Sequence, residues 1–138
     1  MDPLSIAMAV VGLLAAAGKV GELLEVLSGM RNAPQTVKDI LAEVLHTEVA
    51  LRSIQRLLKR LDYSNQRRGL IQIDELRVTL ADAMLMFSSF EVFLTSLPLG
   101  KAWTMASWPK YSKPIKEHMA KIQRYKLSLT LMLTILQW

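Results

Sequence analysis

The sequence predicts an all-α protein, an antiparallel helical bundle of four long helices with a tryptophan-rich connection before the last one. Apolar residues recur at intervals of three and four along four stretches, which is the period of an amphipathic helix. Segments that contain glycine or proline separate these stretches. With 138 residues and no internal repeat, the chain fits a single domain over residues 1–138. Short connections between long helices are typical of a bundle.

The first predicted helix covers Pro3 to Ser28. Asp2 can accept a hydrogen bond as its N-cap, and Pro3 suits the first helical position. Residues 6–18 carry no charge on any side, whereas the second half has an apolar stripe on one face and Lys19, Glu22 and Glu25 on the other. Ser28 and Gly29 form a glycine-type stop.

The uncharged front of this helix must be hidden in a protein core or in a membrane, because it is apolar all round. Residues 3–18 span about 24 Å, less than the ~30 Å hydrocarbon core, although snorkelling of Lys19 would extend the span to about 28 Å. No run reaches 18 apolar residues, so no obligate transmembrane helix is expected. The stretch is therefore too short for a permanent membrane anchor but long enough for one that inserts only under some conditions. Residues 15–17 resemble a signal-peptide cleavage site, but Asp2 in place of Lys or Arg favours a mature helix.

A stripe of small residues lies along one side of the same helix. Its members follow the spacing i, i+4, i+7 and i+11: Ser5, Ala9, Gly12 and Ala16. Small residues allow two helix backbones to approach closely, which is how helices associate in lipid. The stripe is therefore a candidate for helix self-association. The alternative is that another helix of the same bundle packs there.

Three further helices are predicted. The second opens at Pro34 and runs for about 28 residues to Asp62, followed by an exposed loop over 63–69. The third begins between Leu70 and Asp74 and ends at Leu97. Residues 101–114 form the connection that contains Trp103 and Trp108, and the fourth helix starts at Pro114 and continues to the end.

Each of these helices has a predicted core face. In the second it comprises Val37, Ile40, Leu41, Val44, Leu51, Ile54, Leu58 and Leu61, with Glu48 pointing elsewhere. In the third it comprises Leu76, Leu80, Met84, Phe87, Phe90 or Glu91, and Leu94. In the fourth it comprises Ile115, Ile122, Leu129, Met132, Leu133 and Leu136. The fourth helix is nearly all apolar after Leu127, so its second half is expected to be the more buried.

The excess positive charge is confined to the last quarter of the chain. The net charge is +5, and residues 101–138 hold seven basic side chains but only Glu117 as an acidic one. Such a segment suits an anionic surface. The candidate ligands of anionic lipid headgroups are Lys110, Lys113, Lys116, Lys121 and Arg124. The alternative is a solvated helix face, and the two tryptophans suit either a membrane interface or the covered end of a bundle.

No catalytic or metal-binding constellation is recognisable, and we expect neither an enzyme nor a cofactor. His46 and His118 lack a second ligand at metal spacing and are expected at the surface or its boundary. The basic segment lacks the arginine density and the Asn and Gln side chains that read bases, which argues against nucleic acid. Cysteine is absent, which favours an intracellular protein.

Four blocks of the sequence resemble, in order, the HeLo-like N-terminal domains of fungal NLR-type (STAND) receptors. They lie at residues 1–20, 33–44, 74–83 and 121–137, so the resemblance covers essentially the whole chain. HeLo-like domains are related to the HeLo domain and to the four-helix bundle of the mixed-lineage kinase-like pseudokinase. In intact receptors the domain precedes a nucleotide-binding oligomerisation domain, so we expect a domain excised from a longer receptor.

The resemblance implies a membrane-permeabilising cell-death effector in fungal innate immunity or incompatibility, cytoplasmic at rest and at the plasma membrane on activation. The family's membrane-entering helix corresponds to residues 4–14 here. Its expected inserting side chains are Leu4, Ile6, Val10, Val11, Leu13 and Leu14. We expect the first helix to be buried at rest and exposed to anionic membrane lipids on oligomerisation. The alternative is a soluble interaction module whose first helix never leaves the bundle.

Overall fold

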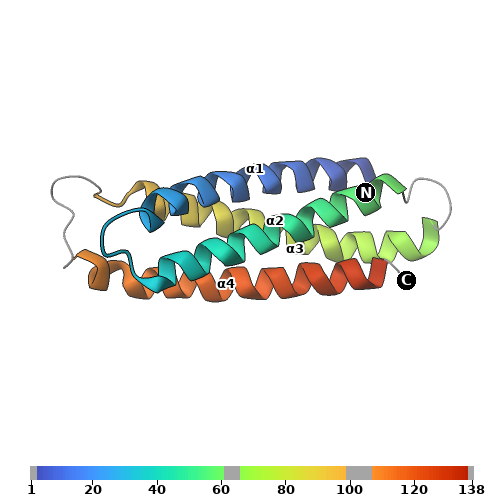
Figure 1. Cartoon of the computed structure of the whole chain (residues 1–138). Coiled ribbons are helices and arrows are strands. Elements are labelled where there is room, and N and C mark those ends of the chain that lie inside the picture. Colours follow the sequence, from blue (N-terminus) through green and yellow to red (C-terminus); the bar gives the residue numbers. More distant parts are fainter. Residues whose placement is uncertain (1–2, 61–65, 99–106, 137–138) are drawn as a thin grey trace.

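The computed structural model describes residues 3–60, 66–98 and 107–136, and it consists of four long helices (Figure 1). They are α1 (Pro3–Ser28), α2 (Gln35–Arg60), α3 (Gln66–Thr95) and α4 (Ser107–Leu136). The prediction of an all-α fold with four long helices is confirmed. Successive helices run in alternate directions, and the beginning of α1 lies at the same end of the bundle as the end of α4 (Figure 1).

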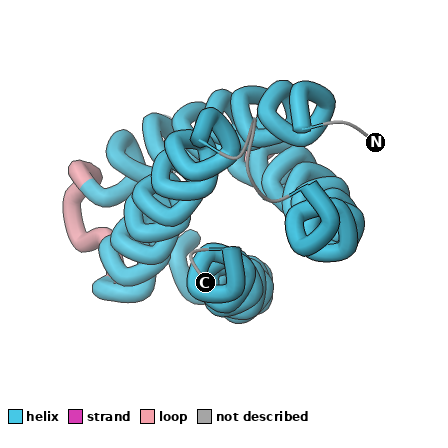
Figure 2. The backbone as a smooth tube through the Cα atoms, turned by 90° about the vertical axis from the view of Figure 1, so that its right-hand side faces the viewer, coloured by secondary structure: helices cyan, strands magenta, loops and turns pink. Residues whose placement is uncertain are grey.

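The four helices form a ring in which each helix packs against two others (Figure 2). α1 packs against α2 and α3, and α4 packs against the same two helices. Within the described residues α1 therefore lies diagonally opposite α4, and α2 lies diagonally opposite α3. The α3–α4 pair makes the least extensive contact of the four neighbouring pairs.

A single apolar core fills the centre of the ring. Its buried members recur mostly at intervals of three and four on α1, α2 and α3, as the periodicity predicts, and at intervals of seven on α4. The largest of them are Ile6, Leu13, Leu24, Leu27, Ile40, Leu51, Ile54, Leu76, Leu80, Phe87, Phe90 and Ile115. Met84, which was expected in this core, is exposed, and Ala83 occupies the core position instead.

The turn between α1 and α2 closes without a left-handed glycine. The Gly29 N–H still donates to the Glu25 carbonyl at 3.1 Å, and the Met30 N–H donates to the Leu27 carbonyl at 3.1 Å. The positive φ of 64° falls at Asn32, a residue type that tolerates the left-handed region. The helix ends where it was predicted to end, but the glycine-type stop was the wrong mechanism.

Two helices begin earlier than the sequence predicts. Residues 66–69, which were expected in a loop, open α3, since Gln66, Arg67 and Arg68 are good helix formers despite their lack of periodicity. α4 starts at Ser107 and not at Pro114, so Trp108 belongs to the helix. Pro109 lies in the first turn, where its missing N–H is harmless, whereas Pro114 is accommodated inside the helix. The rest of the predicted connection, including Trp103, lies outside the described residues.

The second half of α4 is less buried than expected. Leu127 and Leu131 are exposed, and Met132 and Leu133 are only partly buried. A helix in a ring of four has neighbours on two sides only, so an apolar run longer than one stripe must place side chains in solvent.

Glu48 of α2 was expected to point away from the core, but it is buried. The Arg52 guanidinium lies 3.3 Å from its carboxylate.

Candidate functional site

The predicted membrane-inserting residues of α1 lie on two different sides of the helix. Ile6, Val10 and Leu13 are completely buried in the core. Leu14 packs partly against this core, and Val11 is 53% exposed. Leu4 lies outside the side chains that the structure describes. Most of the described inserting set is therefore inside the bundle.

The outer face of α1 is open to solvent and apolar. Met8 is 70% exposed, and its neighbours on this face, Val11 and Ala15, are also exposed. The expectation that the uncharged front is hidden on every side is wrong, because α2 and α3 cover only the inner side of α1. The exposure of Val11 also means that a charge placed there does not enter the core.

The small-residue stripe of α1 makes no close helix contact at Gly12. A Cβ atom built there has no heavy atom within 4 Å, and Ala9 is exposed. Ala16 packs partly against the core, while Ser5 lies outside the described side chains. The close approach within the bundle instead occurs at Gly21, where a Cβ would lie 3.8 Å from Cγ1 of Val44 and 3.6 Å from Oε1 of Glu48.

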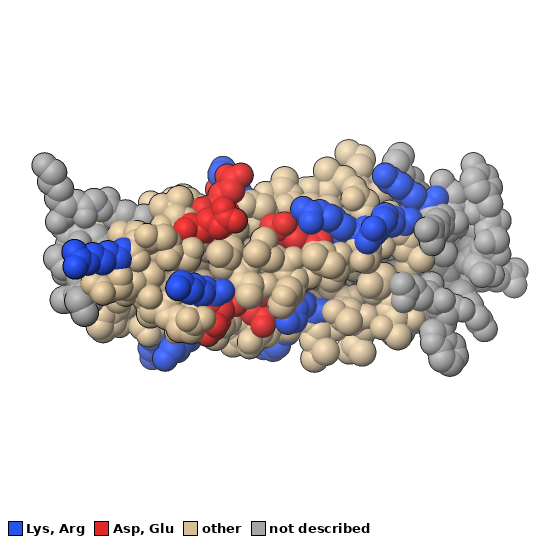
Figure 3. Space-filling view, viewed as in Figure 1, with Lys and Arg blue, Asp and Glu red and all other residues tan. Residues whose placement is uncertain are grey.

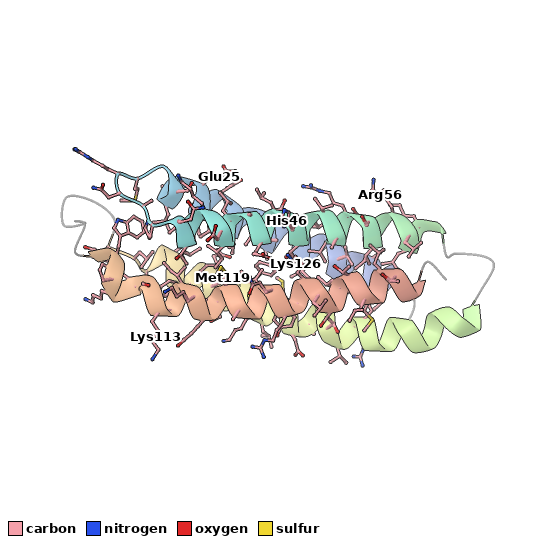
Figure 4. The ribbon with its side chains drawn as sticks, turned by 60° about the horizontal axis from the view of Figure 1, so that its bottom comes forward. Glu25, His46, Arg56, Lys113, Met119 and Lys126 are labelled. Carbon is pink, nitrogen blue, oxygen red and sulfur yellow. The ribbon has the colours of Figure 1, made fainter. Side chains whose placement is uncertain are left out.

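All five predicted headgroup ligands are exposed along α4, and Figure 4 shows Lys113 pointing away from the bundle. Lys121 and Arg124 line a groove of about 410 Å³ between α3 and α4, together with Asp82 and Tyr125. Lys113 and Lys116 line a separate shallow depression beside Pro109. Lys110 lies 5.6 Å from the centre of the Tyr111 ring. The five cations thus form a row along one helix with two distinct clusters.

Charges elsewhere on the bundle are largely paired or mixed in sign. Lys19 of α1 lies 3.0 Å from Glu91 of α3, and Lys126 of α4 lies 2.6 Å from Glu43 of α2. Lys126 therefore pairs within the fold, between α4 and α2. Figure 3 shows acidic and basic side chains interspersed across one face of the bundle. α4 carries five exposed cations, and the second half of α2 carries a smaller group, Arg52, Arg56 and Lys59, of which Arg52 pairs with Glu48.

His118 occupies an aromatic cluster between α3 and α4. Its ring stacks on Phe90 with centroids 4.4 Å apart and lies 5.5 Å from Phe93, which in turn meets Tyr111 edge-on at 6.3 Å. Burial lowers the pKa of His118 below 6.5, Lys121 lowers it further, and Glu117 opposes the shift. The half-buried position fits the predicted boundary site, whereas the stacking was not predicted. His46 is exposed, as expected.

Trp108 is buried at the start of α4, so this indole covers an end of the bundle. This placement matches one of the two predicted uses of the tryptophans. Within the described ranges, no cluster of three or more His, Cys, Asp or Glu side chains forms a metal site.

By length and composition, two helices are apolar enough to cross a membrane: Ile6–Ser28 of α1 and Leu76–Thr95 of α3. The second of these was not foreseen, because Arg77, Asp82 and Glu91 interrupt its apolar runs. Comparison with known proteins gave no match: no family model fits the chain, and no curated protein or solved structure is significantly similar to it. The HeLo-like resemblance stays a prediction.

Proposed function

We propose that the chain is a membrane-permeabilising cell-death effector domain of a fungal innate-immunity or incompatibility receptor. It is cytoplasmic at rest, and it binds the anionic plasma membrane through α4 and inserts α1 on oligomerisation. The nucleotide-binding oligomerisation domain expected in the full receptor would supply the trigger. The observation that carries the proposal is a membrane-length apolar helix, α1, held in one bundle with an exposed basic row on α4.

The ring order favours two successive steps. α4 presents its cations without any change in the fold, and each contributes about 1 kcal/mol near an anionic surface. Because α1 lies diagonally opposite α4, a membrane bound to the outer face of α4 lies across the bundle from α1. α1 must therefore leave its place between α2 and α3 in order to insert.

Release of α1 into water is strongly unfavourable. Six large apolar side chains of this helix are buried: Ile6, Val10, Leu13, Val20, Leu24 and Leu27. At ~1.5–3 kcal/mol each, their exposure would cost on the order of 10 kcal/mol. Insertion into lipid buries them again, and oligomerisation can cover the surfaces of α2 and α3 that α1 leaves behind. The resting bundle is therefore stable until both are available.

A reversible disulfide between α1 and α2 tests this mechanism. A Cβ atom at Gly21 would lie 3.8 Å from Cγ1 of Val44, so the pair Gly21→Cys and Val44→Cys places two side chains in contact between α1 and α2, and the chain has no cysteine of its own. We expect the reduced double variant to release dye from vesicles that contain phosphatidylserine, and the oxidised one to bind them without release. Dye release by the oxidised form equal to that of the reduced form would contradict insertion of α1.

Two controls complete the experiment. Each single cysteine variant should be insensitive to oxidant, and zwitterionic vesicles should bind neither form.

Val11→Glu adds a charge to the exposed face of α1 and should reduce release while the fold is retained. A folded, oligomeric wild-type domain that releases no dye would favour the soluble interaction module.

A further inference from the structure

An exposed, uncharged stripe runs along the outer face of α3, opposite to its core residues. Val78, Leu85 and Val92 are 55%, 71% and 68% exposed, and they recur every seven residues. Ala81 and Ser88 lie between them, Thr95 follows Val92, and all three are exposed as well. The six residues span about 26 Å, and their alternating three- and four-residue spacing is that of a coiled-coil seam.

We propose that this α3 stripe, defined by Val78, Ala81, Leu85, Ser88, Val92 and Thr95, is a homodimer interface that pairs with the antiparallel α3 of a second copy. The proposal goes beyond the function proposed above and does not rest on it, since the pairing needs no lipid. It also differs from the α1 stripe, because it uses large apolar side chains on another helix.

The order of large and small residues favours the antiparallel direction. In an antiparallel pair centred between Met86 and Phe87, Leu85 faces Ser88 of the second copy, Val92 faces Ala81, and Val78 faces Thr95. Every large side chain then meets a small one, which lets the layers interdigitate. A parallel pair in register would place large against large and small against small, which gives alternating crowded and empty layers.

The flanking charges fit the same arrangement. Arg77 and Glu91 lie on one flank of the stripe, near opposite ends. In an antiparallel pair, Arg77 of one copy lies near the same end of the interface as Glu91 of the other copy. That Glu91 is 3.0 Å from Lys19 of its own bundle. Such a contact is isologous, since both copies contribute the same residues, and isologous dimers are the commonest oligomers.

The charges around this stripe are mixed in sign. Leu76–Thr95 itself carries Arg77 against Asp82 and Glu91. On the α4 side, Leu85 lines the same groove as Lys121 and Arg124, so the size order of the stripe residues, and not charge, selects a second copy. A single helix pair of this length lies at the small end of stable interfaces, so we expect reversible association in the roughly micromolar range.

Sedimentation equilibrium without lipid tests the association, with Val92→Glu as the disrupting variant. Val26→Glu is the matched control, because Val26 is 62% exposed and also lies in the last turn of its helix. We expect Val92→Glu to weaken the dimer roughly tenfold or more, since the charge enters the interface twice, while Val26→Glu leaves it unchanged. A wild-type domain that stays monomeric at millimolar concentration would overturn the proposal, as would equal effects of the two variants.

Cysteine cross-linking tests the direction. In the antiparallel pair, residues 81 and 92 of different copies face each other, whereas each lies about 16 Å along the helix axis from its own counterpart, at ~1.5 Å per residue. We therefore expect a mixture of Ala81→Cys and Val92→Cys to form disulfide-linked dimers, and each variant alone to form few. Self-linking of each variant alone would show a parallel pair and overturn the arrangement. Loss of vesicle binding in Val92→Glu without any change in association would identify a lipid-binding face instead.

Discussion

α1 and α4 present their functional candidates in opposite ways. The described inserting residues of α1 mostly point into the core, and only Val11 is largely exposed. All five headgroup candidates of α4 point outward, and the one lysine of that helix that is paired across the bundle, Lys126, was not among them. A pattern of charged residues therefore predicts which side chains are on the surface at rest. A pattern of apolar residues predicts only which side chains a helix can bury, in the bundle or in a membrane.

The largest effect is expected within α1, where the neighbouring residues Val10 and Val11 should differ in how much a charge destabilises the fold. Val10→Asp puts a charge into the core and should lower the free energy of unfolding by about 3 kcal/mol or more. Val11→Asp faces solvent and should change it by about 0.5 kcal/mol or less. Urea denaturation followed by circular dichroism measures both. Similar losses for the two variants would mean that Val11 is buried in solution.

A second test addresses α4 alone. The double variant Lys113→Gln with Lys116→Gln should weaken binding to phosphatidylserine vesicles by about 2 kcal/mol, or roughly 30-fold, and leave the unfolding curve unchanged. Lys38→Gln with Lys59→Gln removes two exposed lysines from α2 and should have a smaller effect. Vesicle co-sedimentation at low and high salt measures the difference. Equal effects of the two pairs would mean that net charge, and not the α4 row, governs binding.

A third test separates the internal lysine of α4 from the external ones. Lys126→Met leaves the largely buried Glu43 without its partner and should cost about 1 kcal/mol of unfolding free energy. Lys113→Met should cost less than about 0.5 kcal/mol, because Lys113 is exposed. Thermal and urea denaturation give both values. If the two substitutions are equivalent, the α2–α4 ion pair does not stabilise the fold.

The smallest expected effect is the pH dependence of stability that His118 causes at the contact between α3 and α4. Because burial lowers the pKa of His118 in the fold, the unfolded chain takes up its proton first as the pH falls below 6.5. This contribution to stability is complete above pH 6.5 and is lost as the pH falls through the lowered pKa. His118→Phe keeps a ring against Phe90 and should show a smaller decrease in melting temperature between about pH 7.5 and about pH 5. An unchanged decrease would assign the pH dependence to other groups.

Much of the fold follows from local pattern. The intervals of three and four residues identified all four helices and most of the core, for example Val37, Ile40 and Val44 on α2. The pattern failed where helix formers without apolar spacing extend a helix, as at Gln66–Gly69, and where a proline is tolerated, as at Pro114. Met84 was misplaced because α3 carries apolar residues on both faces, and Ala83 satisfies the same periodicity.

Of the candidate site, the sequence predicted the exposed cations of α4 but not the α3 stripe or the contacts of His118. The α4 cations needed no tertiary information, because a lysine or arginine rarely enters a core unpaired. The α3 stripe was missed, although Val78, Leu85 and Val92 are spaced at seven residues, since the core series of the same helix also satisfies that spacing. The aromatic contacts of His118 join two helices that the sequence cannot place side by side.

The four helices, most of the inward stripe of each helix and the basic row of α4 follow from the sequence alone, because these depend on residue type and on spacing along one chain. Only the tertiary structure decided that α1 and α4 are diagonal, that Val11 and Leu85 face solvent, and that Lys126 is paired with Glu43. The reason is geometric. Burial and pairing depend on which helices are neighbours, and in a ring of four each helix has two covered sides and one open side, which the order of residues along the chain does not specify.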